Sequence, residues 1–524
     1  MIKNLSAILP HRNNALEKLA AENNTWDIVV IGGGASGLGT ALDAACRGYK
    51  VLLLEQHDFA KGTSSRSTKL VHGGVRYLAQ GNIKLVREAS VERGLLYKNA
   101  AHLVKNQSFL VPVYNYFDAL QYTVGLKLYD WIAGTLSMGA SRFVSAKKAK
   151  EKLPGIYHKN LKGAIEYHDG QFDDARLAIN LVQSIWENAG YAFNYIKVTG
   201  LQKNEQGKIA AVSAFDTETG RCFSFKTKSV VNATGVFADE ILQMDQPGSS
   251  KTVCVSQGIH LVVDKKFHPS AEALMIPKTS DGRVLFAVPW HGKVVIGTTD
   301  TAVETASLEP VALKKEIDFI LETTGEYLVH KPAAADILSV FAGQRPLAAP
   351  KEGSQKTKEI SRSHKIVVSA SNLFTMLGGK WTTYRKMAED MLDKIEENMQ
   401  WPRIKSATKN LSIHGNMQPK DNDAFYFYGT DAAFLQMDEQ GWISKKLHIH
   451  RYQIEWAVKN EMCRTVEDFL ARRTRALILD AKESMRIAPE VATIMSGLLN
   501  EDANWIKKQV DSYNEVAGKY IFRS

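Results

Sequence analysis

The chain has 524 residues, of which 44% are hydrophobic and 23% charged, a composition typical of a globular protein large enough for two or three domains. Its four cysteines are dispersed and form no C-x-x-C pair, which argues against a zinc site and against a disulfide framework. The formal net charge of +10 is compatible with a generally basic surface, an anionic membrane, a nucleic acid or an anionic substrate.

Residues 1–25 are predicted to form a short helix or a loose N-terminal arm. They lack the apolar core of a signal peptide, and Glu17 and Glu22 argue against a transit peptide. Further along the chain, no stretch reaches the roughly 20 consecutive apolar residues that a membrane-spanning helix needs. We therefore expect no transmembrane span.

A strand, a glycine-rich turn and a helix are predicted at residues 26–47, followed by a second strand that ends at Glu55. The Gly-x-Gly-x-x-Gly spacing falls on Gly32, Gly34 and Gly37. In this order, the glycines permit a tight turn, the approach of backbone to a pyrophosphate, and close packing of helix on strand. A carboxylate at Glu55 accepts hydrogen bonds from both ribose hydroxyls and repels a 2′-phosphate. The pattern therefore favours FAD or NAD over NADP.

Hydroxyl, glycine and basic residues are concentrated at residues 62–78, directly after this unit. The hydroxyls offer hydrogen bonds to a diphosphate or to the edge of a flavin, and the glycines bring backbone close to a flat ring. The candidate cofactor residues are Thr63, Ser64, Ser65, Ser67, Lys69, His72, Gly73 and Gly74, and Arg76 and Tyr77 add a cation and a phenol.

Helices are predicted at residues 81–101 and 173–188, and a further strand at 229–235 ends in small residues against which a nucleotide can lie. The candidates there are Ala233 and Gly235. Residues 251–340 are strand-rich and predict an antiparallel meander, unlike the alternating β/α start of the chain.

The last glycine signal is Gly378-Gly379, which precedes Lys380, Thr382 and a helix that extends to about Met399. Free N–H groups and a positive helix end at this position would stabilise an anionic reduced flavin. After an irregular, polar stretch at residues 401–424, the chain is predicted to be helical to its end.

Six motifs taken together resemble the FAD-dependent glycerol-3-phosphate dehydrogenases of the aerobic, respiratory type. They lie at residues 31–34, 63–78, 231–235, 296–300, 343–347 and 378–386, and residues 456–475 also resemble that family's helical C-terminal domain. The match runs in order through residues 26–480. Trp381 departs from the pattern, since a smaller aliphatic residue is expected there.

The resemblance implies an α/β fold with a glutathione-reductase-like, FAD-binding Rossmann domain, an antiparallel-sheet substrate domain and an all-helical C-terminal domain. The expected boundaries are an arm at residues 1–25, an FAD-binding domain within 26–400 (mainly 26–105, 165–250 and 340–400), an interleaved substrate domain at about 106–164 and 251–339, a linker at 401–424 and a helical domain at 425–524.

The resemblance also implies a reaction, namely oxidation of sn-glycerol 3-phosphate at C2 to dihydroxyacetone phosphate. A hydride would pass to the flavin N5, and the electrons would leave to a membrane quinone. Arg345 and Arg76 match positions that bind the substrate phosphate, a task suited to the planar fork of arginine. Tyr77 is expected to bind substrate as well.

Catalysis needs a base for the substrate hydroxyl, and His260 is the first choice and His72 the second. Arg345 is expected to take part in catalysis as well as in binding. Lys380 is expected to neutralise negative charge on the reduced flavin or on the substrate oxygen, which makes it a candidate for cofactor binding, substrate binding and catalysis. No metal site is expected.

Two alternatives keep the fold, namely a glycerophosphate oxidase that uses oxygen and a related FAD amine or amino-acid oxidase. An RNA-binding flavoprotein is disfavoured, because aromatic residues do not interleave with a basic stripe. The chain lacks a D-x-[DN]-x-[DN]-G calcium loop and so resembles the bacterial form. We therefore expect a cytoplasmic protein, peripheral on the inner face of the cell membrane, with residues 119–142 or the C-terminal helices at an anionic lipid surface. A homodimer is one option that the sequence leaves open.

Overall fold

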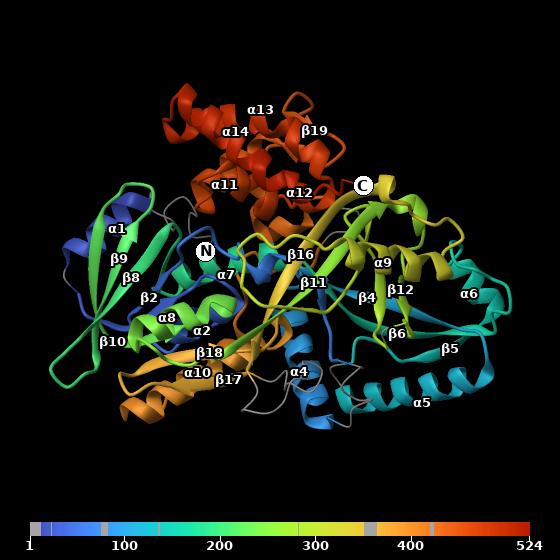
Figure 1. The fold of residues 1–524 in the computed structure, drawn as a ribbon, viewed down its shortest axis with the longest axis horizontal. Helices are drawn as coiled ribbons and strands as arrows, with labels where there is room; N and C mark the ends of the chain where they lie inside the picture. The colour runs from blue at the N-terminus through green and yellow to red at the C-terminus, as the bar shows by residue number, and fades with distance from the viewer. Residues whose placement is uncertain are drawn as a thin grey trace.

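The computed structural model describes residues 12–22, 24–74, 82–134, 137–280, 282–349, 364–419 and 424–523. Two sheets lie beside each other, and the C-terminal helices lie above them in the view of Figure 1. The long strands β11 and β16 lie in the middle of the molecule, between the glycine-rich unit and the outer strands of the second sheet.

The first sheet surrounds the glycine motif and has a parallel core in the order β18-β10-β1-β2-β7. Strand β17 adds an antiparallel edge beside β18, and β8 and β9 form a meander that continues onto β10. The strands are β1 (Trp26–Ile31), β2 (Val51–Leu54), β7 (Tyr191–Phe193), β8 (Ile196–Lys203), β9 (Ile209–Asp216), β10 (Cys222–Asn232), β17 (Lys365–Val368) and β18 (Leu373–Leu377).

Strand β1 is apolar from Ile28 to Ile31 because both of its faces are covered there. Ile28 and Val30 face the helices α2 (Ala35–Cys46), α7 (Asp174–Glu187) and α10 (Tyr384–Met399). Val29 and Ile31 face the opposite layer, which contains the β8–β9 meander, α8 (Ala238–Asp245) and α1 (Arg12–Ala21). The described part of the N-terminal arm is thus a docked helix, with Arg12 paired to Asp216 at 3.1 Å.

The second sheet has ten strands and is antiparallel except where β12 pairs with β4. Its central order is β15-β11-β14-β13-β12-β4-β6-β3, with β16 on the other edge of β11 and β5 beside β6. The strands are β3 (Leu70–Val71), β4 (Val104–Val113), β5 (Arg142–Ser145), β6 (Gly163–Phe172), β11 (Val253–Asp264), β12 (Ala273–Ile276), β13 (Leu285–Trp290), β14 (Lys293–Gly297), β15 (Thr301–Val303) and β16 (Ile337–Ala348).

Helices cover both faces of this sheet. Helices α6 (Ala146–Lys152) and α9 (Lys314–Tyr327) pack on one face, and α5 (Tyr116–Ala133) packs on the other, with α4 (Ile83–Asn99) beside it. The short helices η5 (Lys265–Phe267) and η6 (Ala334–Asp336) lie in connections of this region.

Strand pairing corrects two predicted domain boundaries. Strand β6 pairs with β4 over its whole length, and β16 pairs with β11 from Ile337 to Ala348. Residues 163–172 and 337–348 therefore belong to the second sheet, although the sequence places most of them in the nucleotide-binding domain. Local pattern did not show this, because the partner strands lie far away in the chain.

The C-terminal part is helical, as expected, and also contains one short two-stranded ladder. Its elements are η10 (Tyr426–Phe434), β19 (Trp442–Ser444), β20 (Ile449–His450), α11 (Arg451–Asn460), η11 (Asp468–Arg473), α12 (Ala476–Leu479), α13 (Ala481–Leu499) and α14 (Ala503–Gly518). Within the described ranges, no helix combines the length and the apolar character needed to cross a membrane.

Buried ion pairs join the C-terminal part to the first sheet. Asp58, in the loop after β2, contacts Arg472 at 2.5 Å and Arg473 at 2.6 Å. Arg176 on α7 makes two bonds of 2.7 and 2.8 Å to Glu461. Burial alone would raise the pKa of Asp58, but the two guanidinium groups hold it below its ordinary value.

Candidate active site

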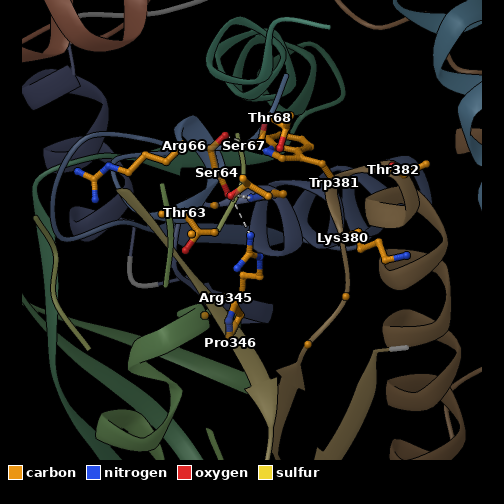
Figure 2. A pocket seen from close by; sticks show the side chains of 18 of the residues that line it. Thr63, Ser64, Arg66, Ser67, Thr68, Arg345, Pro346, Lys380, Trp381 and Thr382 are labelled. Atoms are coloured by element: carbon orange, nitrogen blue, oxygen red, sulfur yellow. Dashed lines mark hydrogen bonds between the residues drawn. The ribbon is translucent and has the colours of Figure 1, made fainter. Parts of the chain in front are cut away.

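A cavity of about 930 Å³ lies where the carboxyl ends of β1, β2 and β10 meet the second sheet. Open α/β sheets bind ligands at this edge, because loops and helix starts gather there. Figure 2 shows Thr63, Ser64 and Thr68 on one side of this cavity, with Arg345 directed toward them. The lining also includes the start of α2, the end of β10, and the turn before α10, where η8 (Trp381–Thr383) begins.

The glycine motif shapes the nucleotide side of the cavity. Gly32 has a φ of +107°, and a Cβ there would lie 2.7 Å from the carbonyl oxygen of Ala233. A Cβ on Gly37 would lie 1.9 Å from the Gly32 carbonyl oxygen. Helix α2 can therefore start directly against the end of β1 only because both positions lack a side chain.

The start of α2 has the properties of a diphosphate site. The Ala35 N–H donates to Ser64 Oγ at 2.9 Å, whereas the N–H groups of Ser36 and Gly37 have no protein acceptor among the described residues. A Cβ on Gly235, which has a φ of +62°, would meet no atom within 4 Å. This open cradle, with the helix dipole, fits a bound dinucleotide diphosphate.

Glu55 lies at the end of β2, as predicted, and its carboxylate braces the turn. One oxygen accepts from the Gly33 N–H at 2.6 Å, and the other accepts from the His57 N–H at 2.9 Å. Burial raises the pKa of Glu55, and the two backbone bonds oppose that effect. The residue lines the cavity, and its contact with a ribose stays a prediction.

The hydroxyl-rich loop connects the two sides of the cavity. The Thr63 hydroxyl donates to the Gln344 carbonyl on β16 at 2.5 Å, and Ser67 donates to Asp174 at the start of α7 at 2.7 Å. The residues of this stretch that line the cavity are Gly62, Thr63, Ser64, Arg66, Ser67, Thr68, Leu70, His72 and Gly74.

Three predicted cofactor residues, Ser65, Lys69 and Gly73, do not line the cavity. Lys69 is turned inward, where its ammonium contacts Asp174 at 2.8 Å and the Ser65 carbonyl at 2.6 Å. Ser65 itself is buried beneath the loop. Gly73 lies against the Tyr129 hydroxyl, 2.3 Å from where its Cβ would stand. These residues hold the loop in place.

The substrate side of the cavity is built on two paired strands. In the β11–β16 ladder, Ser256 lies opposite Arg345 and His260 lies opposite Phe341. Because side chains alternate along a strand, Arg345, Gly258 and His260 share one face. A Cβ on Gly258 would lie 2.3 Å from an Arg345 Nη atom. The guanidinium therefore lies over Gly258, on the side of His260.

His260 is buried and held in one orientation. Its ring stacks on Phe341 with centroids 4.9 Å apart, and its Nε2 is 2.9 Å from the Thr68 hydroxyl. Its Nδ1 is inaccessible and has no partner among the described residues, so Nε2 is the nitrogen available at the cavity. Burial lowers the pKa of His260 well below its ordinary value, and the positive charges of Arg345 and Lys69 add to that effect. The imidazole is therefore neutral at pH 7.

Arg345 is held at one edge and half-open to the cavity. Its guanidinium donates to Thr298 Oγ1 at 3.2 Å and to the Thr299 carbonyl at 3.1 Å, and it lies 3.5 Å from Asp300. These partners belong to the motif at residues 296–300, at the end of β14. A planar cation fixed in this way can bind an oxyanion with two hydrogen bonds.

The remaining predicted residues are distributed as follows. Gly378, Gly379, Lys380, Thr382, Ala233 and Gly235 line the cavity, as do Gly32, Gly34 and His72. The Lys380 ammonium points away from Arg345 in Figure 2, so its action on a substrate oxygen stays a prediction. Arg76 and Tyr77 lie outside the described residues.

Three contributors were not identified from the sequence. Thr68 contacts the imidazole of His260, and Gly258 makes room for Arg345. The unexpected Trp381 donates its indole N–H to the Ser64 carbonyl at 2.8 Å, which ties the turn before α10 to the hydroxyl-rich loop. Each role depends on a partner far away in the chain. Of the three, only Thr68 could have been identified from the sequence, because it lies within a dense cluster of hydroxyl residues.

Family comparisons agree with this arrangement of two sheets and a C-terminal part. Residues 27–385 match the family described as FAD dependent oxidoreductase, and residues 375–506 match the C-terminal domain of alpha-glycerophosphate oxidase. Among solved structures, the chain resembles a glycerol-3-phosphate dehydrogenase from Bacillus halodurans complexed with FAD, with a TM-score of 0.76 and 27% identity over 98% of this chain and 100% of that chain. An L-alpha-glycerophosphate oxidase from Mycoplasma pneumoniae with FAD bound shares the fold, with a TM-score of 0.55 and 18% identity over 73% of this chain and 97% of that chain.

Curated relatives extend the similarity over nearly the whole sequence. The chain is 34% identical to a mitochondrial glycerol-3-phosphate dehydrogenase of Saccharomyces cerevisiae, over 95% of this chain and 89% of that protein. It is also 34% identical to the mitochondrial glycerol-3-phosphate dehydrogenase of Homo sapiens, over 95% of this chain and 73% of that protein. The chain therefore belongs to the family of FAD-dependent glycerol-3-phosphate dehydrogenases.

Proposed function

We propose that this chain oxidises sn-glycerol 3-phosphate at C2 to dihydroxyacetone phosphate and passes the electrons to a membrane quinone. The substrate loses a hydride from C2 and a proton from its hydroxyl. The quinone takes up the two electrons and two protons and leaves as a quinol. The protein acts as a peripheral enzyme on the inner face of the cell membrane.

The observation that carries this proposal is the placement of Arg345 and His260 on one face of the β11–β16 ladder, with Gly258 between them. A phosphate bound by Arg345 lies only three bonds from C2 of the substrate. A neutral imidazole beside it is a suitable acceptor for the proton of the C2 hydroxyl. Arg345 would orient the substrate, and His260 Nε2 would accept the proton.

The nucleotide side of the cavity would hold the cofactor of the family, FAD. Its diphosphate would lie against the start of α2 at Ser36 and Gly37, and Gly235 would leave room for the chain that connects its two halves. When bound, FAD supplies at N5 the acceptor for the hydride. His72, Gly378, Gly379 and Lys380 would contact the flavin end.

Anaerobic titration of the yellow holoenzyme with sn-glycerol 3-phosphate tests the proposal. The flavin absorbance should bleach with the phosphorylated substrate and should require a far higher concentration of plain glycerol. Arg345→Ala should raise the required concentration on the order of 100-fold, because a charge-assisted pair of hydrogen bonds is lost. Its flavin content should not change, because Arg345 lies on the other side of the cavity.

Arg486→Ala is the matched control, since this surface guanidinium lies outside the cavity and pairs with Glu483 on its own helix. It should titrate like the parent enzyme. Failure of the parent to bleach with glycerol 3-phosphate would contradict the proposal. Bleaching by an amino acid instead would indicate the amine or amino-acid oxidase activity.

A second candidate differs only in the electron acceptor. Residues 375–506 match a domain named for alpha-glycerophosphate oxidase, and this match makes oxygen the second candidate electron acceptor. Mixing the reduced enzyme rapidly with oxygen or with a short-chain quinone separates the two. The dehydrogenase predicts fast reoxidation by quinone with little peroxide, whereas the oxidase predicts fast peroxide formation.

A further inference from the structure

Helix α5 has two apolar faces, although only one of them is buried in the protein. Ala119, Leu126 and Tyr129 form the inner face and pack toward the second sheet and α4. Helices that face water on one side normally carry polar residues there. In α5 the opposite side is apolar as well, so that side needs a separate explanation.

The outer face is a continuous stripe of large apolar side chains. Phe117 is 76% exposed, Leu120 65%, Val124 59% and Trp131 79%. With Leu128, they follow one another at intervals of three or four residues, which places them on one side of the helix. Tyr116 extends the stripe at the helix start. We name these six residues the α5 stripe.

The stripe is unusual within this molecule. Fifteen large apolar side chains are exposed in the described part of the chain, and six of them belong to α5. By contrast, residues 424–523 of the C-terminal part, the other segment that the sequence favoured for membrane contact, expose only Phe434 among their large apolar side chains. Figure 1 shows α5 at the outer edge of the molecule, next to β5.

Basic side chains lie beside the α5 stripe. Arg142 on the neighbouring strand β5 is exposed and pairs with Glu166 at 2.7 Å. Lys127 is exposed on α5 itself, and Lys162 lies over the Tyr116 ring at 5.8 Å. Lys278 contacts Asp118 at 3.0 Å and so offsets one of the carboxylates. An apolar stripe with a basic rim is complementary to an anionic lipid surface.

We propose that the α5 stripe is the surface by which this enzyme lies on an anionic lipid bilayer, with Trp131 and Phe117 inserted at the headgroup level. The inference deepens the proposed function, on which it rests for the lipid-soluble acceptor. It selects one segment as the membrane contact and assigns no such role to the C-terminal helices.

The position of α5 gives this contact a consequence for electron transfer. Tyr122, Leu126 and Leu128 on the same helix line the active-site cavity. A helix with its side chains is about 10 Å thick, so no more than this helix would separate the cavity from the lipid, and Leu128 of the α5 stripe would border both. A lipid-soluble quinone would then reach the cavity at the edge of α5 without crossing bulk water.

Vesicle sedimentation of the holoenzyme tests the contact. The parent should bind vesicles of phosphatidylcholine with 30% phosphatidylglycerol at least tenfold more tightly than pure phosphatidylcholine vesicles. The triple variant Phe117→Ser, Leu120→Ser, Trp131→Ser should bind the anionic vesicles at least tenfold more weakly. The variant Val311→Ser, Val329→Ser, Ile404→Ser removes exposed apolar groups elsewhere and should bind like the parent.

Two further measurements test the positive charge beside the α5 stripe and the transfer of electrons to a quinone in the bilayer. Lys127→Glu should weaken binding to anionic vesicles severalfold and should leave binding to neutral vesicles unchanged. With glycerol 3-phosphate as donor, the triple serine variant should lose at least tenfold in activity toward a long-chain quinone embedded in vesicles. It should keep its activity toward a water-soluble dye, because none of the three side chains lines the cavity.

Two results would overturn the inference. One is unchanged vesicle binding by the triple serine variant. The other is a dimeric parent that the triple variant converts to a monomer without altering vesicle binding, which would assign the α5 stripe to a second copy of the chain. Failure of the proposed function is distinguishable, because it would appear as absent bleaching by glycerol 3-phosphate in solution whatever the vesicles show.

Discussion

The two sides of the cavity are built from different kinds of groups. The nucleotide side depends largely on backbone, namely the glycines at positions 32 and 37 and the N–H groups at the start of α2, next to the side chains of Glu55 and Ser64. The substrate side consists of side chains, with Arg345 and His260 presented by two paired strands. On the first side, a glycine contributes because the absence of a Cβ leaves room for backbone to approach. On the second side, a residue contributes the functional groups of its side chain.

This difference decides how each side responds to substitution. A site built from backbone is disrupted when a new side chain collides with neighbouring backbone, and a chemically similar side chain does not relieve that collision. A side-chain site loses one chemical step while the fold and the cofactor remain. The following predictions separate the two behaviours.

The largest effect is expected from Gly37→Val. The new Cβ would stand 1.9 Å from the Gly32 carbonyl oxygen, and neither backbone segment can move away without separating α2 from β1. We expect loss of bound FAD and of the folded first sheet, measured by flavin absorbance and circular dichroism. The control is Gly497→Ala, because that glycine lies in α13 with no atom within 4 Å of its Cβ position. It should be neutral or slightly stabilising.

The second effect separates chemistry from cofactor binding. His260→Gln should retain FAD and should slow anaerobic flavin reduction by about 10²- to 10⁴-fold, the usual range for loss of a general base. In the parent enzyme, the lowered pKa of His260 keeps the imidazole deprotonated below pH 6.5. The reduction rate should therefore not show the decline near pH 6.5 that a histidine base of ordinary pKa would cause. A bell-shaped profile with a limb near pH 6.5 would contradict this assignment.

The third effect tests whether the nucleotide side depends on backbone alone. Asp58 follows β2, but it acts through its carboxylate on Arg472 and Arg473. Asp58→Asn leaves two buried cations without full compensation and should lower the free energy of unfolding by about 3–5 kcal/mol in urea titrations. Asp318→Asn breaks only an exposed pair with Lys314 and should cost less than about 1 kcal/mol. If the two variants had equal free energies of unfolding, the ion pairs of Asp58 would not stabilise the contact with the C-terminal part.

The smallest effect lies outside both sides of the cavity. Burial alone would lower the pKa of His414, but Asp431 and Glu187 raise it to about 9. Its contribution to stability should be complete below pH 6.5, the ordinary histidine value, and should be lost as the pH rises through about 9. We expect a loss on the order of 1–3 kcal/mol across this window, measured by urea titration at several pH values. His414→Gln should flatten that profile, and the exposed His330→Gln should not change it.

The sequence predicted the parts of the site that depend on neighbours in the chain. The β1-α2-β2 unit was found because three glycines and two apolar strands lie within 30 residues. The inward turn of Lys69 and the space above Gly258 were missed, because each depends on a residue that only the fold brings near. The same limit misplaced β6 and β16, whose apolar patterns fit either sheet.

The pairing register of β11 and β16 fixes the position of Arg345 relative to His260. A slip of one residue would turn Arg345 to the opposite face, and a slip of two would move it by about 6.6 Å along β11. Twelve consecutive residues of β16, from Ile337 to Ala348, resist such a slip. The relative position of Arg345 and His260 is thus set by the alignment of two strands over their whole length, including residues remote from the cavity.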